Sequence, residues 1–447
     1  MIKTPPLVAV VGRPNVGKST FFNVIAGRRV SIVESTPGVT RDRVYATVEW
    51  TGRRFTLIDT GGIDTQSEDV LFSQMRDQAQ IAIDTADLVL FFTDARDGLT
   101  PQDEEVAALL RAAKKPVLLV VNKVDFAGLD SAVYEYYALG LGDPIGISAA
   151  NMLGLGDLLD AILAHLPEDK TEEEEGERLH VALVGRPNVG KSSLLNRLLG
   201  QNRAMVSDIP GTARDAIDTL LLRPDGTVWN LIDTAGIRRK AAVEDGTIER
   251  YSVLRSFAAI RRCDVALLVI DAKDGVTEQD TKIAGMIRDA GKGCVIVINK
   301  WDAVEKETGT LEDTRKEVLA RLDFIAYAPV LFISALTGQR AERVFDEVSS
   351  VYAEATRRVP TGALNDVLGD AQIALQPPAI NGHRLKIYYG TQFGVQPPAF
   401  RLFVNDAQLL HFAYRRYLEN QLRKAFGFAG TPLELELTNR SQKEAQA

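Results

Sequence analysis

The sequence contains Gly12-Arg13-Pro14-Asn15-Val16-Gly17-Lys18-Ser19 near its start and repeats the same eight residues as Gly185-Arg186-Pro187-Asn188-Val189-Gly190-Lys191-Ser192. Each copy follows a run of small and β-branched residues and precedes a helical pattern, which is the context of a phosphate-binding loop. Glycines let the backbone N–H groups turn inward as an anion nest, and the dipole of the following helix adds positive charge. The repeat therefore predicts two sites for a phosphate-bearing ligand.

The side chains that close each loop predict how it holds a triphosphate. In each copy the lysine is expected to reach the β and γ phosphates, and the serine hydroxyl is a candidate Mg²⁺ ligand. A chance glycine turn before a helix is the alternative, and two copies in the same context make it a poor explanation. The predicted set comprises Lys18, Ser19 and Thr20 in the first copy, and Lys191, Ser192 and Ser193 in the second.

A second pair of motifs lies downstream, each at the end of an apolar run. They read Asp59-Thr60-Gly61-Gly62 and Asp233-Thr234-Ala235-Gly236. We expect each aspartate to hold Mg²⁺ through water, and the N–H of Gly62 or Gly236 to sense the γ-phosphate. Loss of that phosphate would release the loop that follows, so each site has the parts of a switch.

The loop between these motifs carries a candidate Mg²⁺ ligand in the first copy, Thr40, within Thr36-Pro37-Gly38-Val39-Thr40-Arg41-Asp42. Aligned from its Pro-Gly pair, the second copy has Ala213 at the position of Thr40, so that Thr212 is the only threonine there able to serve. We therefore expect metal-driven closure of this loop more in the first copy than in the second.

Each copy also carries an Asn-Lys-x-Asp element at the end of an apolar run and a Ser-Ala pair after its last predicted strand. The aspartate accepts hydrogen bonds from the ring N–H and exocyclic amine of guanine, neither of which adenine offers there. A backbone N–H of the Ser-Ala pair is expected to contact guanine O6. Together the motifs predict GTP rather than ATP. They are Asn122-Lys123-Val124-Asp125 with Ser148-Ala149, and Asn299-Lys300-Trp301-Asp302 with Ser334-Ala335.

The residues expected to activate water for hydrolysis are unusual. Ras-like enzymes place a water-orienting glutamine after the last glycine of Asp-x-x-Gly, but Ile63 and Ile237 stand there and cannot orient water. Asn15 and Asn188 offer side-chain oxygens to a monovalent cation beside the phosphates, which would supply the charge that an arginine finger brings. Stabilising the loop is the alternative role of these asparagines, and the residues alone do not separate the two.

Length and patterning predict the domain organisation. The 447 residues suggest about three domains. Apolar runs without alternation predict parallel strands covered on both faces, whereas alternation over 44–50 predicts an edge strand. The predicted fold class is α/β, with two tandem, doubly wound P-loop GTPase domains and a small α+β domain of order α-β-β-α-β. The predicted boundaries are 1–167, an acidic linker at 168–178, 179–354 and 355–447.

Charge and composition limit the classes of partner. The net charge is −8, but the residues from Ala355 onward carry eleven Lys or Arg against seven Asp or Glu. This basic end points weakly to an RNA surface, and ordinary variation between domains explains it equally well.

Cys263 and Cys294 are expected to be buried apolar residues. Since no apolar run approaches a membrane span and the first motif lies close to Met1, we expect a cytoplasmic protein without a membrane partner.

The tandem motifs, acidic linker and small α+β tail closely resemble the Der (EngA) family, bacterial GTPases with two G domains and a KH-like domain. The resemblance covers nearly the whole chain. It implies GTP hydrolysis coupled to assembly of the large ribosomal subunit, contact with ribosomal RNA, and potassium stimulation through Asn15 and Asn188. It also implies the replacement of glutamine at Ile63 and Ile237. We further expect a monomer that does not bind DNA.

The tail departs from typical KH modules in the way it would meet RNA. We expect RNA contact through surface charge and shape and not through a Gly-x-x-Gly backbone clamp, although Gly427-Phe428-Ala429-Gly430 has that spacing just after the long helix. Four basic residues mark its long helix, and a solvated face explains them as well as an RNA surface does. They are Arg415, Arg416, Arg423 and Lys424.

Two functional hypotheses follow. In the first, the protein is an enzyme used as a timer, in which GTP binding orders loops in both G domains and hydrolysis resets them. In the second, the second G domain holds nucleotide as a structural ligand, and the protein is a scaffold with one switch. Turnover of Lys18→Ala and Lys191→Ala proteins separates them, because the scaffold loses turnover only with Lys18→Ala. A tRNA-modifying GTPase lacks support, since no additional catalytic cluster is present.

Overall fold

The computed structural model describes most of the chain, in two compact units that span 4–174 and 175–447. Each unit is treated by itself. The predicted linker at 168–178 lies almost wholly outside the described residues. The described ranges are 5–27, 45–59, 79–80, 82–83, 85–113, 115–125, 127–166, 178–201, 218–223, 225–233, 248–305, 307–380 and 382–439.

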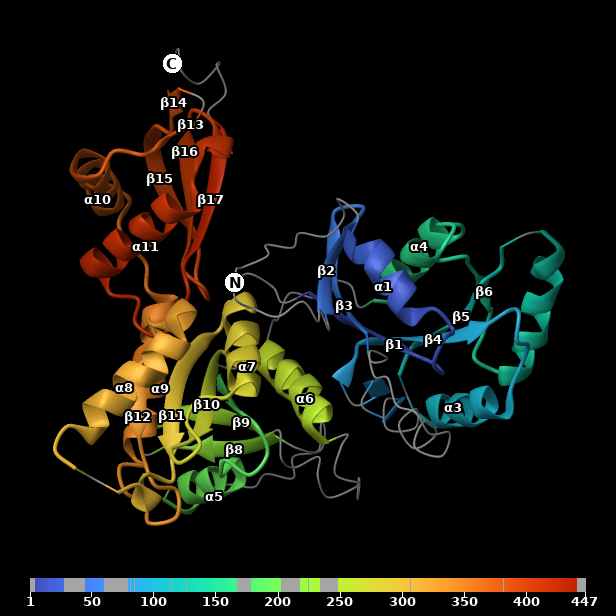
Figure 1. Ribbon diagram of the computed structural model, residues 1–447, viewed down its shortest axis with the longest axis horizontal. Coiled ribbons are helices and arrows are strands. Elements are labelled where there is room, and N and C mark those ends of the chain that lie inside the picture. Colours follow the sequence, from blue (N-terminus) through green and yellow to red (C-terminus); the bar gives the residue numbers. More distant parts are fainter. Residues whose placement is uncertain are drawn as a thin grey trace. The chain divides into compact units, whose positions relative to one another are not determined.

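The first unit is built on a six-stranded sheet with the order β2-β3-β1-β4-β5-β6 (Figure 1). Its central strands pair in parallel, and β2 pairs with β3 in the antiparallel sense. The alternating segment thus forms an edge strand, as predicted. The strands are β1 (Leu7–Val11), β2 (Tyr45–Trp50), β3 (Arg53–Asp59), β4 (Leu88–Asp94), β5 (Val117–Asn122) and β6 (Ile145–Gly146).

Both faces of this sheet are covered. Val8 and Val10 of β1 pack in the same core as α1 and α4, while Ala9 and Val11 pack in the core of α3 and η1. Because successive side chains of a strand point to opposite faces, a strand covered on both sides must be apolar throughout. The helices are α1 (Lys18–Gly27), α3 (Pro101–Ala112), η1 (Ala127–Leu139, 3₁₀) and α4 (Leu155–His165).

The second unit begins with a sheet of the same kind, with the order β12-β11-β10-β7-β9-β8. The antiparallel strand β8 (Asp218–Leu222) is the counterpart of β2 and was not predicted, because its Leu220 to Leu222 run does not alternate. The predicted last strand also ends one residue early. The other strands are β7 (Arg178–Val184), β9 (Val228–Asp233), β10 (Val265–Asp271), β11 (Gly293–Asn299) and β12 (Val330–Phe332).

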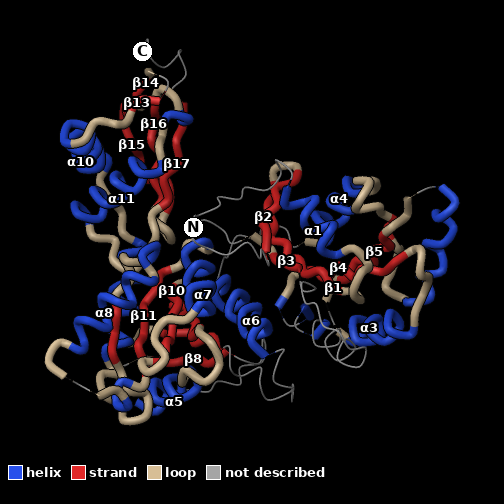
Figure 2. The backbone as a smooth tube through the Cα atoms, viewed as in Figure 1, coloured by secondary structure: helices blue, strands red, loops and turns tan. Residues whose placement is uncertain are grey.

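Helices again cover this second sheet, as Figure 2 shows in blue around the red strands. One face packs in a common core with α5 and α9, through side chains such as Leu194 and Val348. The amphipathic helix α7 buries Ile283 and Ile287. The helices are α5 (Lys191–Gln201), α6 (Ile248–Arg262), α7 (Glu278–Asp289), η3 (Trp301–Ala303), α8 (Thr310–Arg321), η4 (Asp323–Ile325) and α9 (Arg343–Thr356).

The second unit ends in a small α+β domain in which α10 and α11 lie on one face of a three-stranded sheet (Figure 1). The predicted order α-β-β-α-β is confirmed, and a hairpin of two-residue strands is an addition to it. The elements are α10 (Thr361–Ala374), the hairpin β13 (Ala379–Ile380) and β14 (His383–Arg384), β15 (Ile387–Gly394), β16 (Ala399–Val404), η5 (Ala407–Leu409), α11 (Phe412–Phe426) and β17 (Glu434–Asn439).

Two basic residues of α11, Arg416 and Arg423, contact the preceding G domain. The Arg423 guanidinium lies 4.4 Å from the ring centroid of Tyr327 and donates to the Thr431 carbonyl at 2.7 Å. Arg416 pairs with Asp323 at 3.3 Å. For Arg423, therefore, neither predicted role, a solvated face or an RNA surface, is correct: this residue joins the small domain to the second G domain.

The two cysteines are both free and buried, as predicted. Burial raises the pKa of the Cys263 thiol to about 12. Among the helices that the structure describes, none combines the length and apolar character needed to cross a membrane.

Candidate nucleotide sites

In both G domains the predicted loop joins the first parallel strand to a helix, and its lysine folds back over it. Lys18 Nζ donates to the carbonyls of Gly12 and Arg13 at 2.6 and 2.7 Å. Lys191 Nζ makes the same two bonds in the second copy, at 2.7 Å each. Each ammonium group thus lies at the centre of its loop, where the phosphates of a nucleotide would bind.

Burial makes the charged form of the Lys18 ammonium group less stable than it would be in water. Burial lowers its pKa from 10.5 to about 8, an effect that nearby Asp59 opposes and Arg13 reinforces. A buried cation with too little negative charge around it favours an anionic ligand, because the ligand restores the missing partner.

A glycine in each loop is required by contact with the Asn-Lys-x-Asp element. Gly17 has φ +94°, and a Cβ there would lie 2.2 Å from Nδ2 of Asn122. Gly190 has φ +95°, and its Cβ would lie 2.3 Å from Nδ2 of Asn299. Any side chain would collide with that amide and strain the backbone. The loop and the base-recognition element are therefore packed directly against each other.

The two asparagines connect three motifs that lie far apart in the sequence. Asn122 Nδ2 donates to the Val16 carbonyl at 2.8 Å, and its Oδ1 accepts from the Ala149 N–H at 3.0 Å. Asn299 makes the corresponding bonds with Val189 and Ala335, at 2.8 and 2.9 Å. The sequence predicted that a backbone N–H of the Ser-Ala pair contacts guanine O6. In the structure the N–H of Ala149 and of Ala335 is bonded to asparagine, and the base contact stays a prediction.

The carboxylate predicted to read guanine is held in place in the first site. Asp125 accepts from Ser148 Oγ at 2.6 Å and from Asn151 Nδ2 at 3.1 Å, and it pairs with the Arg96 guanidinium. The hydrogen bond from Ser148, followed by that from Arg96, lowers the pKa of Asp125. The ionised form, which accepts hydrogen bonds from guanine, is thereby stabilised.

The second site is arranged differently around its base-reading carboxylate. Asp302 is exposed, whereas Asp125 is half-buried. Ser334 Oγ accepts from the Thr337 N–H at 3.0 Å, as Ser148 Oγ accepts from the Asn151 N–H at 3.3 Å, but among the described residues only Ser148 also donates to the aspartate. The lysine of each element is anchored alike: Lys123 pairs with Asp94 at 2.5 Å, and Lys300 with Asp271 at 2.6 Å.

The loop arginines hold the loops to a neighbouring helix. Arg13 Nε donates to Asp103 of α3 at 3.2 Å, and Arg186 lies 3.7 Å from Asp280 of α7. Both belong to the predicted nucleotide-binding set; their side chains point to carboxylates in the structure, and their contact with the nucleotide stays a prediction. The carboxylates were missed, although each closes a Thr-x-x-Asp capping box, the second beginning at Thr277.

The predicted Mg²⁺ ligands of the first site lie together. Ser19 Oγ donates to Asp59 Oδ2 at 2.8 Å, so two hard oxygen donors of the kind that Mg²⁺ prefers share one corner of the site. These residues fit the ion. In the second site the backbone of Asp233 ends β9, and its side chain lies outside the described part.

The predicted cation ligands Asn15 and Asn188 are exposed and share φ +65°, a conformation that asparagine adopts more readily than most residues. Several predicted switch residues lie outside the described residues. These are Thr40, Gly62, Ile63, Thr212, Ala213, Gly236 and Ile237.

Comparison with known families gives the same arrangement. A family model described as 50S ribosome-binding GTPase matches residues 7–123 and 180–300. A second model, described as the KH-domain-like C-terminal part of EngA bacterial GTPase enzymes, matches residues 358–438. An elongation factor Tu GTP-binding domain model matches residues 250–354.

Full-length relatives decide the family. GTPase Der of Acetivibrio thermocellus is 56% identical over 98% of this chain and 99% of the relative. GTPase Der of Ruminiclostridium cellulolyticum is 58% identical over 96% of this chain and 97% of the relative. The chain belongs to the GTPase Der family. Membership of the Der family establishes a GTP-binding protein that hydrolyses GTP.

Solved structures similar to this Der-family chain include other GTPases. Aquifex aeolicus Era bound to GDP.AlF4- is 21% identical, with a TM-score of 0.30, over 74% of this chain and 92% of that one. The G domain of the T. maritima FeoB iron transporter is 26% identical, with a TM-score of 0.27, over 36% of this chain and 98% of that one.

Proposed function

We propose that this protein is an assembly factor of the large ribosomal subunit that binds ribosomal RNA and is timed by GTP hydrolysis in two G domains. The proposal rests on the observation that the same site occurs twice. In each copy one asparagine side chain hydrogen-bonds both the phosphate-binding loop and the Ser-Ala pair. The name of the matching family model, 50S ribosome-binding GTPase, supports the partner.

Different residues of each site bind different parts of the nucleotide. The loop N–H groups and Lys18 or Lys191 hold the phosphates, and Asp125 or Asp302 selects guanine. Mg²⁺, when bound near Ser19 and Asp59, neutralises charge on the phosphate oxygens. The asparagine bridge fixes the distance between the phosphate end and the base end, so the site is preorganised before the nucleotide enters.

We propose further that Asn15 and Asn188 supply oxygens to a potassium ion beside the phosphates, since isoleucine replaces the water-orienting glutamine in each copy. Turnover is then expected to be faster in K⁺ than in Na⁺ at equal ionic strength. Asn15→Asp and Asn188→Asp variants should reduce that difference. Equal rates of the unaltered protein in the two salts would refute the role.

The domain limits 1–167, 179–354 and 355–447, a monomeric state, a cytoplasmic location, and the absence of DNA and membrane partners also belong to the proposal. The compact units at 4–174 and 175–447 and the family match at 358–438 are compatible with those limits.

Sedimentation with purified ribosomal subunits tests the proposed partner. The protein is mixed with small or large subunits in GDP or in a non-hydrolysable GTP analogue. Co-migration with the large subunit in the analogue is expected, because ordered switch loops favour one arrangement of the domains. If the protein co-migrates with neither subunit, whichever nucleotide is present, the assembly role is wrong.

A further inference from the structure

A pocket at the open edge of the second sheet lies outside the nucleotide sites. It has a volume of about 250 Å³ and is formed where α8 and the start of α9 flank β12. Three of its lining side chains are arginines, and the others are apolar. The lining residues are Leu311, Arg315, Val330, Leu331, Phe332, Arg340 and Arg343.

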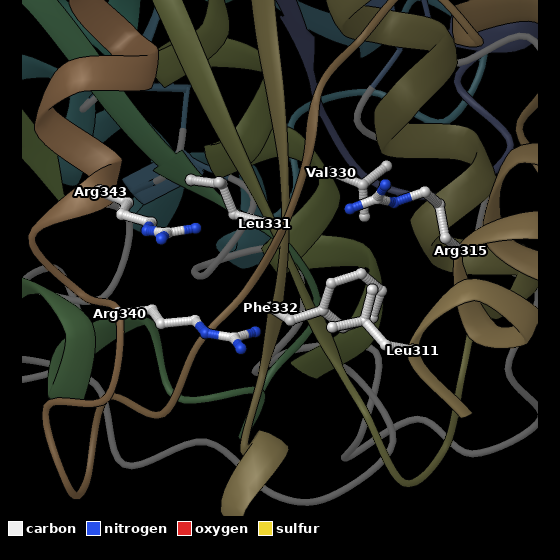
Figure 3. A pocket seen from close by; sticks show the side chains of 7 residues that line it. All are labelled: Leu311, Arg315, Val330, Leu331, Phe332, Arg340 and Arg343. Carbon is white, nitrogen blue, oxygen red and sulfur yellow. The ribbon is translucent and has the colours of Figure 1, made fainter. Parts of the chain in front are cut away.

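The arginines approach the strand from two directions. In Figure 3, Arg340 and Arg343 reach toward β12 from one side, and Arg315 lies on the other. Within the described residues, neither Arg340 nor Arg343 has a carboxylate partner, whereas Arg315 pairs with Glu312 at 3.3 Å on the same helix. Arg315 Nε is buried without a hydrogen-bond partner. Among the described residues, the pocket thus contains one buried donor without a hydrogen-bond partner, Arg315 Nε, and two exposed arginines without a carboxylate partner.

The edge strand adds backbone donors to the same place. β12 is the last strand of its sheet. The Pro329 carbonyl accepts from Ile296 of β11 at 2.9 Å, and the Ile333 N–H donates to Ile298 of β11 at 2.9 Å. Since alternate residues of a parallel strand bond to opposite sides, the N–H groups of Val330 and Phe332 face the open edge.

We propose that this pocket binds a phosphate of the RNA backbone. Guanidinium groups match phosphate oxygens through paired hydrogen bonds, and phosphate contacts fix the register of a protein on nucleic acid. An acidic peptide is less well served, because a strand of three residues offers too few outward peptide groups to hold an extended chain. The inference rests on the proposed ribosomal function and assigns part of its RNA contact.

Binding of large ribosomal subunits and of a short fluorescein-labelled RNA tests the pocket. The full-length Arg340→Gln/Arg343→Gln protein is compared with Lys316→Gln/Arg358→Gln, which loses the same charge from exposed positions outside the pocket. Thermal unfolding of both variants checks that they fold. We expect the pocket variant to bind about tenfold more weakly, and the slope of log affinity against log salt to fall by about 1. The control should change little.

Two further measurements sharpen the outcome. An Arg340→Lys/Arg343→Lys protein keeps the charge and loses the paired bonds, so it should regain the salt slope and only part of the affinity. A polyglutamate peptide should not displace the RNA, and displacement that depends on Arg340 and Arg343 would indicate a peptide site instead.

The outcomes distinguish this proposal from the one on which it rests. If the unaltered protein binds subunits and the pocket variant binds equally well with the same salt slope, the pocket proposal is wrong and the ribosomal role stands. If the unaltered protein binds neither subunits nor RNA, both proposals fail.

Discussion

Asn122 and Asn299 are each buried where three loops meet, and their side-chain amides bond to two of those loops at once. A buried amide that loses one partner leaves the other group unsatisfied, which costs about 1 to 3 kcal/mol. The residues predicted to recognise guanine and those predicted to bind phosphate are therefore linked through this one side chain.

Replacing the amide by a carboxylate tests the coupling. Asn122→Asp keeps the acceptor for Ala149 but loses the donor to Val16, and it places a negative charge beside a carbonyl. GDP affinity of the first site should fall about 10- to 100-fold, as measured by calorimetry. Asn299→Asp should weaken only the second site. Unchanged affinity at the altered site in both variants would show that the bridge is not needed.

The pKa of Lys18 gives a pH dependence of binding. Below pH 8 the lysine is charged with or without ligand. Above pH 8 the free protein loses this proton, and the nucleotide phosphates favour its return, so that GDP binding takes up a proton and weakens as pH rises. The effect on folding has the opposite sign. Burial of the Lys18 ammonium lowers the free energy of unfolding; this destabilisation is fully present below about pH 8 and is relieved as pH rises toward 10.5.

Calorimetry in two buffers of different ionisation enthalpy measures that proton. With Lys191→Ala protein, which isolates the first site, uptake should approach one proton per GDP at pH 9 and vanish at pH 7. Equal uptake at the two pH values would contradict the assignment.

At the residue level the sequence predicted the phosphate-binding loops because the same spacing of glycines and lysine stands between a strand and a helix pattern in both copies. It did not predict that Arg13 and Arg186 pair with Asp103 and Asp280, since those carboxylates lie about 90 residues downstream. The Thr-x-x-Asp capping boxes were the available signal.

At the level of elements, parallel strands buried on both faces were predictable because continuous apolar runs are rare elsewhere. The hairpin β13–β14 has strands too short to carry a period, and the 3₁₀ helix η1 (Ala127–Leu139) lacks a clear apolar stripe. The junction between α11 and the second G domain was also missed, because a basic helix face has the same pattern whether it meets solvent or another domain.

That junction should respond to the loss of Arg423. In Arg423→Gln protein the cation over Tyr327 is lost and the bond to the Thr431 carbonyl is weakened, which should cost about 1 to 3 kcal/mol. We expect differential scanning calorimetry to resolve separate transitions for the small domain and the second G domain.

Lys424→Gln is the matched control for the junction, since Lys424 is the exposed neighbour on the same helix. It should leave the calorimetric profile unchanged. A profile of Arg423→Gln identical to that of the control would mean that the two domains are not coupled through this arginine.

For the whole molecule, the duplication was evident from the sequence, whereas the different surroundings of Asp125 and Asp302 were not. Asp125 is held by Ser148, Asn151 and Arg96, while Asp302 is exposed. The sequence shows the same Asn-Lys-x-Asp spacing in both copies, and only the surrounding side chains distinguish a preorganised carboxylate from an open one.

Isothermal titration calorimetry with GTP and ATP tests the central claim most directly, that the chain has two guanine-selective sites. The unaltered protein should bind two GTP molecules and no ATP at matched concentrations, and Asp125→Asn and Asp302→Asn should each remove the preference at one site. Binding of ATP as tight as that of GTP, or an unaltered preference in both variants, would contradict it.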